Sequence, residues 1–143
     1  MYLGGEGTIG KYDGYQDNGT SYTFDFESCW TDFGTTNLKV FKTIKTTTVG
    51  GANTTVSVKW KVDFEDSSES ASYVIADFDA SEWGTAQYGI DEYGVSDFAV
   101  RMNNVSASRT GQHVSFGLSV DIDGNAFAIQ KMDILAKAGR VNR

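Results

Sequence analysis

The clearest feature of the chain is an alternation of apolar and polar residues with a period of two, which is the pattern of a strand with one buried face. It is regular over 55–64 and 114–122, and it recurs from Tyr22 to Trp30. The apolar sets are Val56, Val58, Trp60, Val62 and Phe64; Val114, Phe116, Leu118, Val120 and Ile122; and Tyr22, Phe24, Phe26 and Trp30. These segments predict three half-buried strands.

Further strands are predicted over 38–48, 72–78, 97–102 and 127–136, with a weak one around 8–12. The turn at 50–53 joins 38–48 to 55–64, and Asp123-Gly124 is a favoured type I′ pair between 114–122 and 127–136. We therefore expect two or three long hairpins, these two among them. No long helix is predicted, although 81–88 or 134–137 has room for one helical turn.

The composition favours an all-β fold, since the chain has 16 glycines, no proline and many Thr, Val and aromatic residues. We predict an antiparallel β-sandwich or jelly-roll-like barrel of about eight strands. The predicted core residues share inward positions on these strands. They are Trp30, Val58, Trp60, Val62, Phe116, Leu118 and Val120.

The charge of the chain limits the classes of partner. Twelve basic and 19 acidic residues give a net charge of −7. A protein that grips nucleic acid gains affinity by neutralising phosphates, so this balance argues against nucleic-acid binding as the main activity. The sequence contains no apolar run long enough for a transmembrane helix and no secretory signal at its start, so no membrane anchoring is predicted.

Because the chain has only one cysteine and one histidine, most sequence motifs of catalytic sites cannot be present. Cys29 has no intramolecular disulfide partner, and a His/Cys zinc site needs three or four ligands. A Ser-His-Asp arrangement would have to use His113. We expect Cys29 to be a small buried or half-buried side chain and His113 to be a surface or hydrogen-bonded residue, and we predict no metal and no cofactor.

Two acidic stretches have a faint likeness to calcium loops, at 121–125 and 13–19. Both lack the ligand spacing of an EF-hand loop, because the glycine comes too early and the bidentate Glu is absent. We therefore interpret 121–125 as a turn, and we give 13–19 the lesser alternative of a surface cation.

Carboxylate pairs could support glycoside hydrolysis, which uses two such groups across a cleft. Asp25 with Glu27, and Asp77 with Asp79, have this spacing on one strand face. The same spacing arises on any acidic strand, so a solvated sheet face is the preferred interpretation. An enzyme would need a cleft that holds two carboxylates without a basic partner, and we predict no enzymatic activity.

An aromatic residue followed by glycine recurs every five residues at Trp83, Tyr88 and Tyr93. Such a loop can plug the end of a sandwich, or it can stack on sugar rings. The second possibility makes a carbohydrate-binding module, including a host-receptor-binding one, the alternative function. Exposed and coplanar rings would favour sugar binding, and buried rings would favour packing.

Long strands without proline leave sheet edges that a monomer must protect. Five lysines are candidates to guard them: Lys39, Lys42, Lys45, Lys59 and Lys61. Otherwise neighbouring subunits or domains cover the edges. This alternative favours an assembly protein.

Six segments together resemble a known family. They are Ser28–Gly34, Leu38–Ile44, Val49–Asn53, Val58–Phe64, Glu82–Gly89 and Ile129–Arg140. The series is similar to the C-terminal β-rich part of tail hub or nozzle proteins of short-tailed bacteriophages, including those named packaged-DNA stabilisation proteins. The resemblance spans Ser28 to Arg140.

The resemblance also implies a domain division. Residues 1–19 resemble the closing strand of a last propeller blade with its linker, and 20–143 would be the β-sandwich domain. Members of this family carry a β-propeller before this region, which this chain lacks. Functions located in the propeller are therefore not carried over.

The resemblance implies a virion protein without catalytic residues, made in the host cytoplasm and located in the tail. Such proteins form a ring, commonly six-fold, beneath the portal and adaptor. They extend the channel through which genomic DNA leaves, and they help retain the DNA until infection. A net charge of −7 suits a channel that DNA slides through without specific binding.

Overall fold

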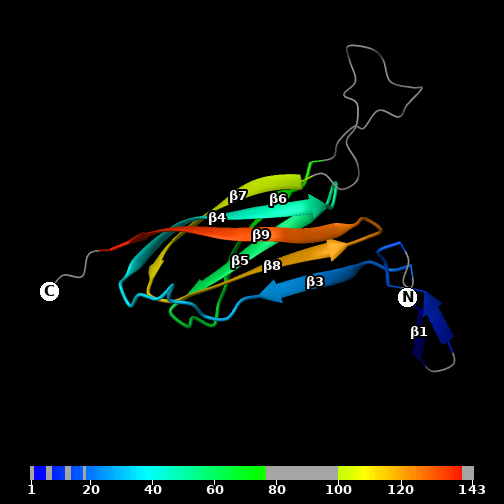
Figure 1. The fold of residues 1–143 in the computed structure, drawn as a ribbon, viewed down its shortest axis with the longest axis horizontal. Helices are drawn as coiled ribbons and strands as arrows, with labels where there is room; N and C mark the ends of the chain where they lie inside the picture. Colours follow the sequence, from blue (N-terminus) through cyan, green and yellow to red (C-terminus); the bar gives the residue numbers. More distant parts are fainter. Residues whose placement is uncertain (1, 6–7, 12–13, 18, 77–99, 140–143) are drawn as a thin grey trace, which may run out of the picture.

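The computed structural model describes residues 2–5, 8–11, 14–17, 19–76 and 100–139, and these residues form strands and no helix (Figure 1). The strands are β1 (Tyr2–Gly5), β2 (Thr8–Lys11), β3 (Tyr22–Glu27), β4 (Lys39–Gly50), β5 (Thr55–Val62), β6 (Glu69–Val74), β7 (Val100–Gly111), β8 (Val114–Ile122) and β9 (Phe127–Ala138).

Two antiparallel sheets pack face to face. One is four-stranded in the order β3-β8-β5-β6, and the other is three-stranded in the order β7-β4-β9. The predicted all-β antiparallel sandwich is confirmed, with seven strands in its two layers. It is not a closed barrel, because β3, β6, β7 and β9 remain sheet edges among the described residues. Strands β1 and β2 pair with each other, and their likeness to a propeller blade stays a prediction.

Both predicted hairpins are wrong, because their strands belong to different sheets. Strand β4 pairs with β7 and β9, whereas β5 pairs with β6 and β8. Likewise β8 pairs with β3 and β5, whereas β9 pairs with β4. Period-two alternation identifies the buried face of a strand but not its neighbour. Here the apolar faces of consecutive strands meet across the core.

Glycine makes the first of these crossings possible. Gly50 and Gly51 have φ of +75° and +71°, a conformation that other residues rarely adopt. A Cβ on Gly51 would lie 2.8 Å from the Phe127 ring and 3.2 Å from Ile75. The turn at 51–54 therefore passes tightly over the end of the core and delivers β5 to the opposite sheet.

The core lies between the two sheets and confirms most of the predicted set. Val58, Trp60, Val62, Leu118 and Val120 are buried, and half-buried Phe116 packs against them. Trp30 is the exception, since it lies outside this core and packs on Phe64, with ring centroids 4.7 Å apart. The chain leaves β3 at Glu27, before Trp30 can follow the inward face.

Strand β7 was largely missed by the sequence pattern, which predicted only 97–102. It runs for 12 residues, and its buried apolar side chains are only Val105 and Ala107. Half-buried polar residues fill its other inward positions, so the alternation is weak. Strand β6 begins at Glu69 rather than at 72 and ends at Val74, and 77–78 of the predicted 72–78 lie outside the described residues; 134–137 belongs to β9 rather than to a helical turn.

The lysines do not guard edges, because β4 and β5 are interior strands. Lys39 is buried, with 3% of its surface exposed. Its Nζ donates hydrogen bonds to the carbonyls of Thr35, Asn37 and Gln112, at 2.5, 3.0 and 3.0 Å. These three acceptors satisfy the ammonium group and tie two loops to the end of β4.

The unequal sheets leave β3 incompletely covered. Phe24 and Phe26 are on its inward face, yet 39% and 41% of their surfaces are exposed. Figure 1 shows β3 running along the margin of the sandwich, beyond β9. The predicted apolar face of β3 is therefore present but not buried.

We predict that Gly117→Ala detaches β3. A Cβ on Gly117 would lie 2.4 Å from the Phe26 carbonyl oxygen, which belongs to the backbone and cannot rotate away. Overpacking of this kind costs about 1–3 kcal/mol. Urea denaturation should show this loss for Gly117→Ala and almost none for Ser119→Ala, two residues along the same strand. Equal unfolding midpoints for the two variants would contradict the close approach.

Candidate functional site

Two edge strands, β3 and β9, form one side of the sandwich, which we call the β3–β9 side. Among the described residues, β3 pairs only with β8 and β9 pairs only with β4. Each strand therefore leaves one row of backbone N–H and C=O groups without a sheet partner. Such rows are templates for pairing with another strand.

Apolar side chains line the space between these two edges. One hollow of about 300 Å³ has Phe24, Phe26, Phe116, Ile129 and Met132 among its lining residues. A second of about 290 Å³ continues along the same side towards Tyr22 and Phe127. The two layers thus separate at this side, and several aromatic rings reach solvent.

The inner face of β3 is apolar, whereas its outer face carries two ion pairs. Lys59 Nζ lies 3.1 Å from Asp25 Oδ1, and Lys61 Nζ lies 2.9 Å from Glu27 Oε1. Both lysines come from β5 and reach diagonally over β8, Lys59 from opposite Gly117 and Lys61 from opposite Ser115, so that the missing side chain of Gly117 leaves room between them. The hydrogen bond from Lys61 lowers the pKa of Glu27, aided by their charge attraction and opposed by partial desolvation.

These pairs bear on the enzymatic alternative. Asp25 and Glu27 each have a lysine partner, so they are not the unpaired carboxylates that glycoside hydrolysis needs. A carboxyl whose pKa is lowered is also a poor general acid near neutral pH. Asp77 and Asp79 lie outside the described residues.

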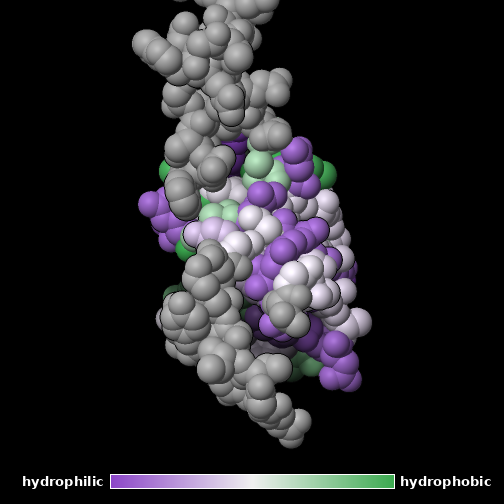
Figure 2. Space-filling view, turned by 90° about the vertical axis from the view of Figure 1, so that its right-hand side faces the viewer, coloured by the Kyte–Doolittle hydropathy of each residue, from purple (hydrophilic) through white to green (hydrophobic). Residues whose placement is uncertain are grey.

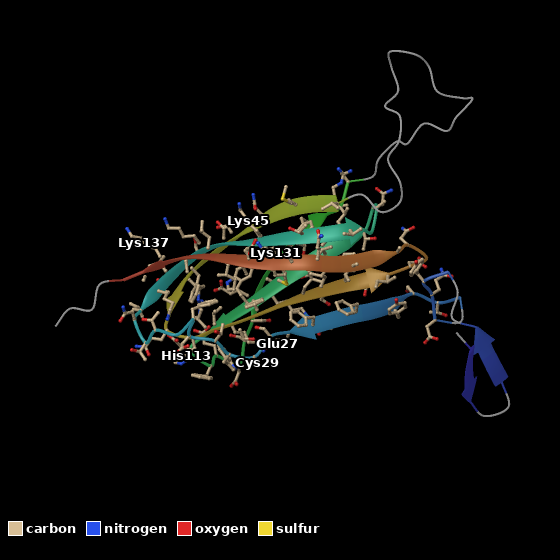
Figure 3. The ribbon with its side chains drawn as sticks, in the orientation of Figure 1. Glu27, Cys29, Lys45, His113, Lys131 and Lys137 are labelled. Atoms are coloured by element: carbon tan, nitrogen blue, oxygen red, sulfur yellow. The ribbon has the colours of Figure 1, made fainter. Side chains whose placement is uncertain are left out.

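The outer face of the three-stranded sheet is basic. Lys42 and Lys45 come from β4, and Lys131 and Lys137 come from β9. Figure 3 shows Lys45, Lys131 and Lys137 along this sheet. Asp133 lies opposite Lys45 in the register and forms an ion pair of 2.9 Å with Lys131. Sequence reasoning noticed Lys42 and Lys45 but missed that β9 adds two more cations to the same face.

An aromatic cluster lies near the start of β8. The ring of Phe64 is 4.7 Å from Trp30 and 4.9 Å from His113, with interplanar angles of 42° and 41°. Phe64 is 61% exposed and has a φ of +64°. Because the rings are tilted, they do not form the flat platform on which a sugar ring stacks.

The single histidine is half-buried, and its nearest described carboxylate is Asp63, at 4.0 Å. Asp63 Oδ1 accepts hydrogen bonds from the backbone N–H groups of Gln112 and His113, at 2.7 and 2.9 Å. These bonds hold the connection from β7 to β8 against the β5–β6 loop. Cys29 is exposed, contrary to the prediction, because the chain has already left β3 at that point.

The calcium-like stretch serves as structure. Asp121 Oδ1 accepts a hydrogen bond from Thr23 Oγ1, and Asp123 Oδ1 accepts one from Gln16 Nε2, both at 2.6 Å. Among the described residues, no three His, Cys, Asp or Glu side chains are placed to hold a metal ion. Viewed from the end with the β8–β9 turn, the described surface mixes hydrophilic residues with residues of intermediate hydropathy, and hydrophobic residues lie at its margins (Figure 2).

The three aromatic residues singled out from the sequence, Trp83, Tyr88 and Tyr93, lie outside the described residues. Their role as plug or ligand platform stays a prediction.

No helix in the described part of the chain is long and apolar enough to cross a membrane.

Comparison of the chain with protein-family models, with curated proteins and with solved structures gives no match.

We predict that Glu27 makes stability depend on pH in the acid range. Its folded pKa lies below the ordinary value of 4.5, so its contribution is present above that value. The contribution is lost as the pH falls through the folded pKa. Because the side chain is largely exposed, we expect less than about 1 kcal/mol.

The measurement is the free energy of unfolding from pH 6 down to pH 3. Glu27→Gln should flatten this dependence slightly, whereas the control Asp66→Asn, in the exposed β5–β6 loop, should leave it unchanged. Parallel curves for the wild-type chain and Glu27→Gln would show that the Lys61 contact does not favour the ionised carboxylate.

Proposed function

We propose that the chain is a structural protein of a tailed-phage virion. In this proposal it is a tail nozzle or hub component that forms part of the DNA-exit channel and helps retain packaged DNA. The resemblance to phage tail hub or nozzle proteins, which spans Ser28 to Arg140, supports this function. The proposed partners are further copies in a ring, with a hexamer as the expected size, together with other tail proteins such as the portal-adaptor.

The single observation that carries the assembly role is the β3–β9 side. A soluble monomer usually blunts its sheet edges with proline, bulged or very short strands, or inward-pointing charges. Here β9 is 12 residues long and has no proline, and the inward side chains of β3 are aromatic; one bulge at Gln130 and two lysines, Lys131 and Lys137, interrupt this edge only in part. An edge of this kind is suited to burial against another subunit.

The outer faces of the two sheets suggest which one would line a channel. On the four-stranded sheet, Lys59 and Lys61 are neutralised by Asp25 and Glu27, and serines occupy much of the remaining face. A surface without free cations lets a phosphate backbone pass without retaining it. We therefore propose that this face, rather than the basic face, is turned towards the DNA.

No observation on the described residues favours the carbohydrate-binding alternative. The rings of Trp30, Phe64 and His113 are not coplanar. We therefore advance no second function, and glycan binding enters only as an outcome of the test.

The test is the solution mass of the purified chain by light scattering over a wide concentration range, followed by electron microscopy of the assembled fraction. We expect a discrete hexamer or a multiple of it, seen as a ring whose central opening admits a DNA duplex. Gel-shift measurements at physiological salt should show no stable complex with duplex DNA.

A chain that forms no ring at any concentration, alone or with tail proteins, would contradict the proposal. Binding in a glycan screen by such a chain would assign the alternative function instead.

A further inference from the structure

We propose that the β3–β9 side is a two-fold interface, in which β3 of one copy covers the open edge of β9 in a second copy. The inference stands on the geometry of this side and goes beyond the proposed function. Its occupant is a second copy of this chain. Three independent features support it: the stagger of the layers, the apolar inner faces and the charges on the outer faces.

The stagger makes the side self-complementary. The four-stranded layer ends in β3 and the three-stranded layer ends in β9, so β3 projects where the opposite layer lacks a strand. A two-fold axis parallel to the strands, between the layers, places each copy's β3 in the other copy's gap. In each layer, one four-stranded and one three-stranded sheet then join.

Strand direction is compatible with this pairing. Figure 1 shows β3 and β9 running in the same direction along the molecule. An axis parallel to the strands preserves direction, so β9 would pair with the partner's β3 as a parallel ladder. From Thr23 to Glu27, β3 has one edge with no sheet partner among the described residues, and β9 has such an edge on either side of its bulge at Gln130.

The apolar faces provide the driving force. Phe24 and Phe26 from both copies would lie across the axis from one another, above Phe116 and beside Met132. They would fill the hollow of about 300 Å³ that is open in one copy alone. Removing these exposed rings from water is the favourable term of such an association.

Charge selects a second copy over an unrelated apolar partner. The outer face of β9 presents Lys131 and Lys137 with Asp133 between them, a net positive set, and the outer face of β3 presents Asp25 and Glu27. In the joined layer these strands become neighbours, and the symmetry repeats the match. The carboxylates stay accessible despite their lysine partners, since 61% and 55% of their side-chain surfaces are exposed.

This contact differs from a ring contact. A two-fold contact uses the same surface of both copies and closes at two, whereas neighbouring copies in a ring meet through two different surfaces. The mass of the assembly therefore separates the two ideas. A dimer that depends on this side supports the two-fold contact, and a hexamer that is insensitive to this side supports the ring alone.

The experiment compares the full chain with Phe26→Glu and with the matched control Met102→Glu, by sedimentation over a wide concentration range. Met102 is 82% exposed on β7, at the opposite edge of its sheet. We expect a self-association that Phe26→Glu weakens by about 100-fold or more, because the new charge would be buried, and that Met102→Glu leaves unchanged.

A second variant tests the interface in case Phe26→Glu does not fold. Lys131→Glu changes a side chain that is 65% exposed, so it should fold normally. It should weaken self-association about fivefold to tenfold, because it places a carboxylate beside the partner's acidic strand. The proposal is overturned if the wild-type chain does not self-associate, or if folded Phe26→Glu and Lys131→Glu assemble like the wild type.

Discussion

The structure depends on one constraint, which is that two sheets of unequal width bury their apolar faces against each other. Val58 and Leu118 from the wider sheet and Ile44 from the narrower one are essentially inaccessible at the centre of this contact. To keep every apolar face inward, the chain crosses from one layer to the other at the β4–β5 turn and again at the β8–β9 turn. The same constraint leaves β3 without an opposing strand. The open side is therefore a direct consequence of four strands packing on three.

This asymmetry also distributes the charges. On the wider sheet, lysines reach across a glycine to the acidic edge strand and are neutralised there, whereas lysines on the narrower sheet outnumber Asp133. One molecule thus presents an ion-paired face, a basic face and an apolar side. A protein with three such different surfaces is suited to an assembly in which each surface has its own neighbour. The proposed structural role would use all three surfaces.

Period-two alternation predicts which face of a strand is buried, and that part of the fold was predicted correctly. The buried faces of β5 and β8 were recovered almost residue by residue, because Val58 and Leu118 alternate with polar neighbours. Pairing was not recovered, since the Asp123-Gly124 turn is as compatible with a crossing between sheets as with a hairpin. Strand β7 was missed because Asn103 and Arg109 occupy inward positions. The open side was missed because Phe24 and Phe26 produce the same pattern whether or not an opposing strand covers them.

The central claim is that the free edges of β3 and β9 are an assembly surface, and backbone hydrogen exchange tests it most directly. The measurement follows individual amides of the full chain at a low and a high protein concentration. The account predicts that the β3 and β9 amides that are not bonded to β8 or β4 become protected at high concentration, while outward amides of β6 and β7 do not. Assembly that leaves exchange at β3 and β9 unchanged would contradict the account.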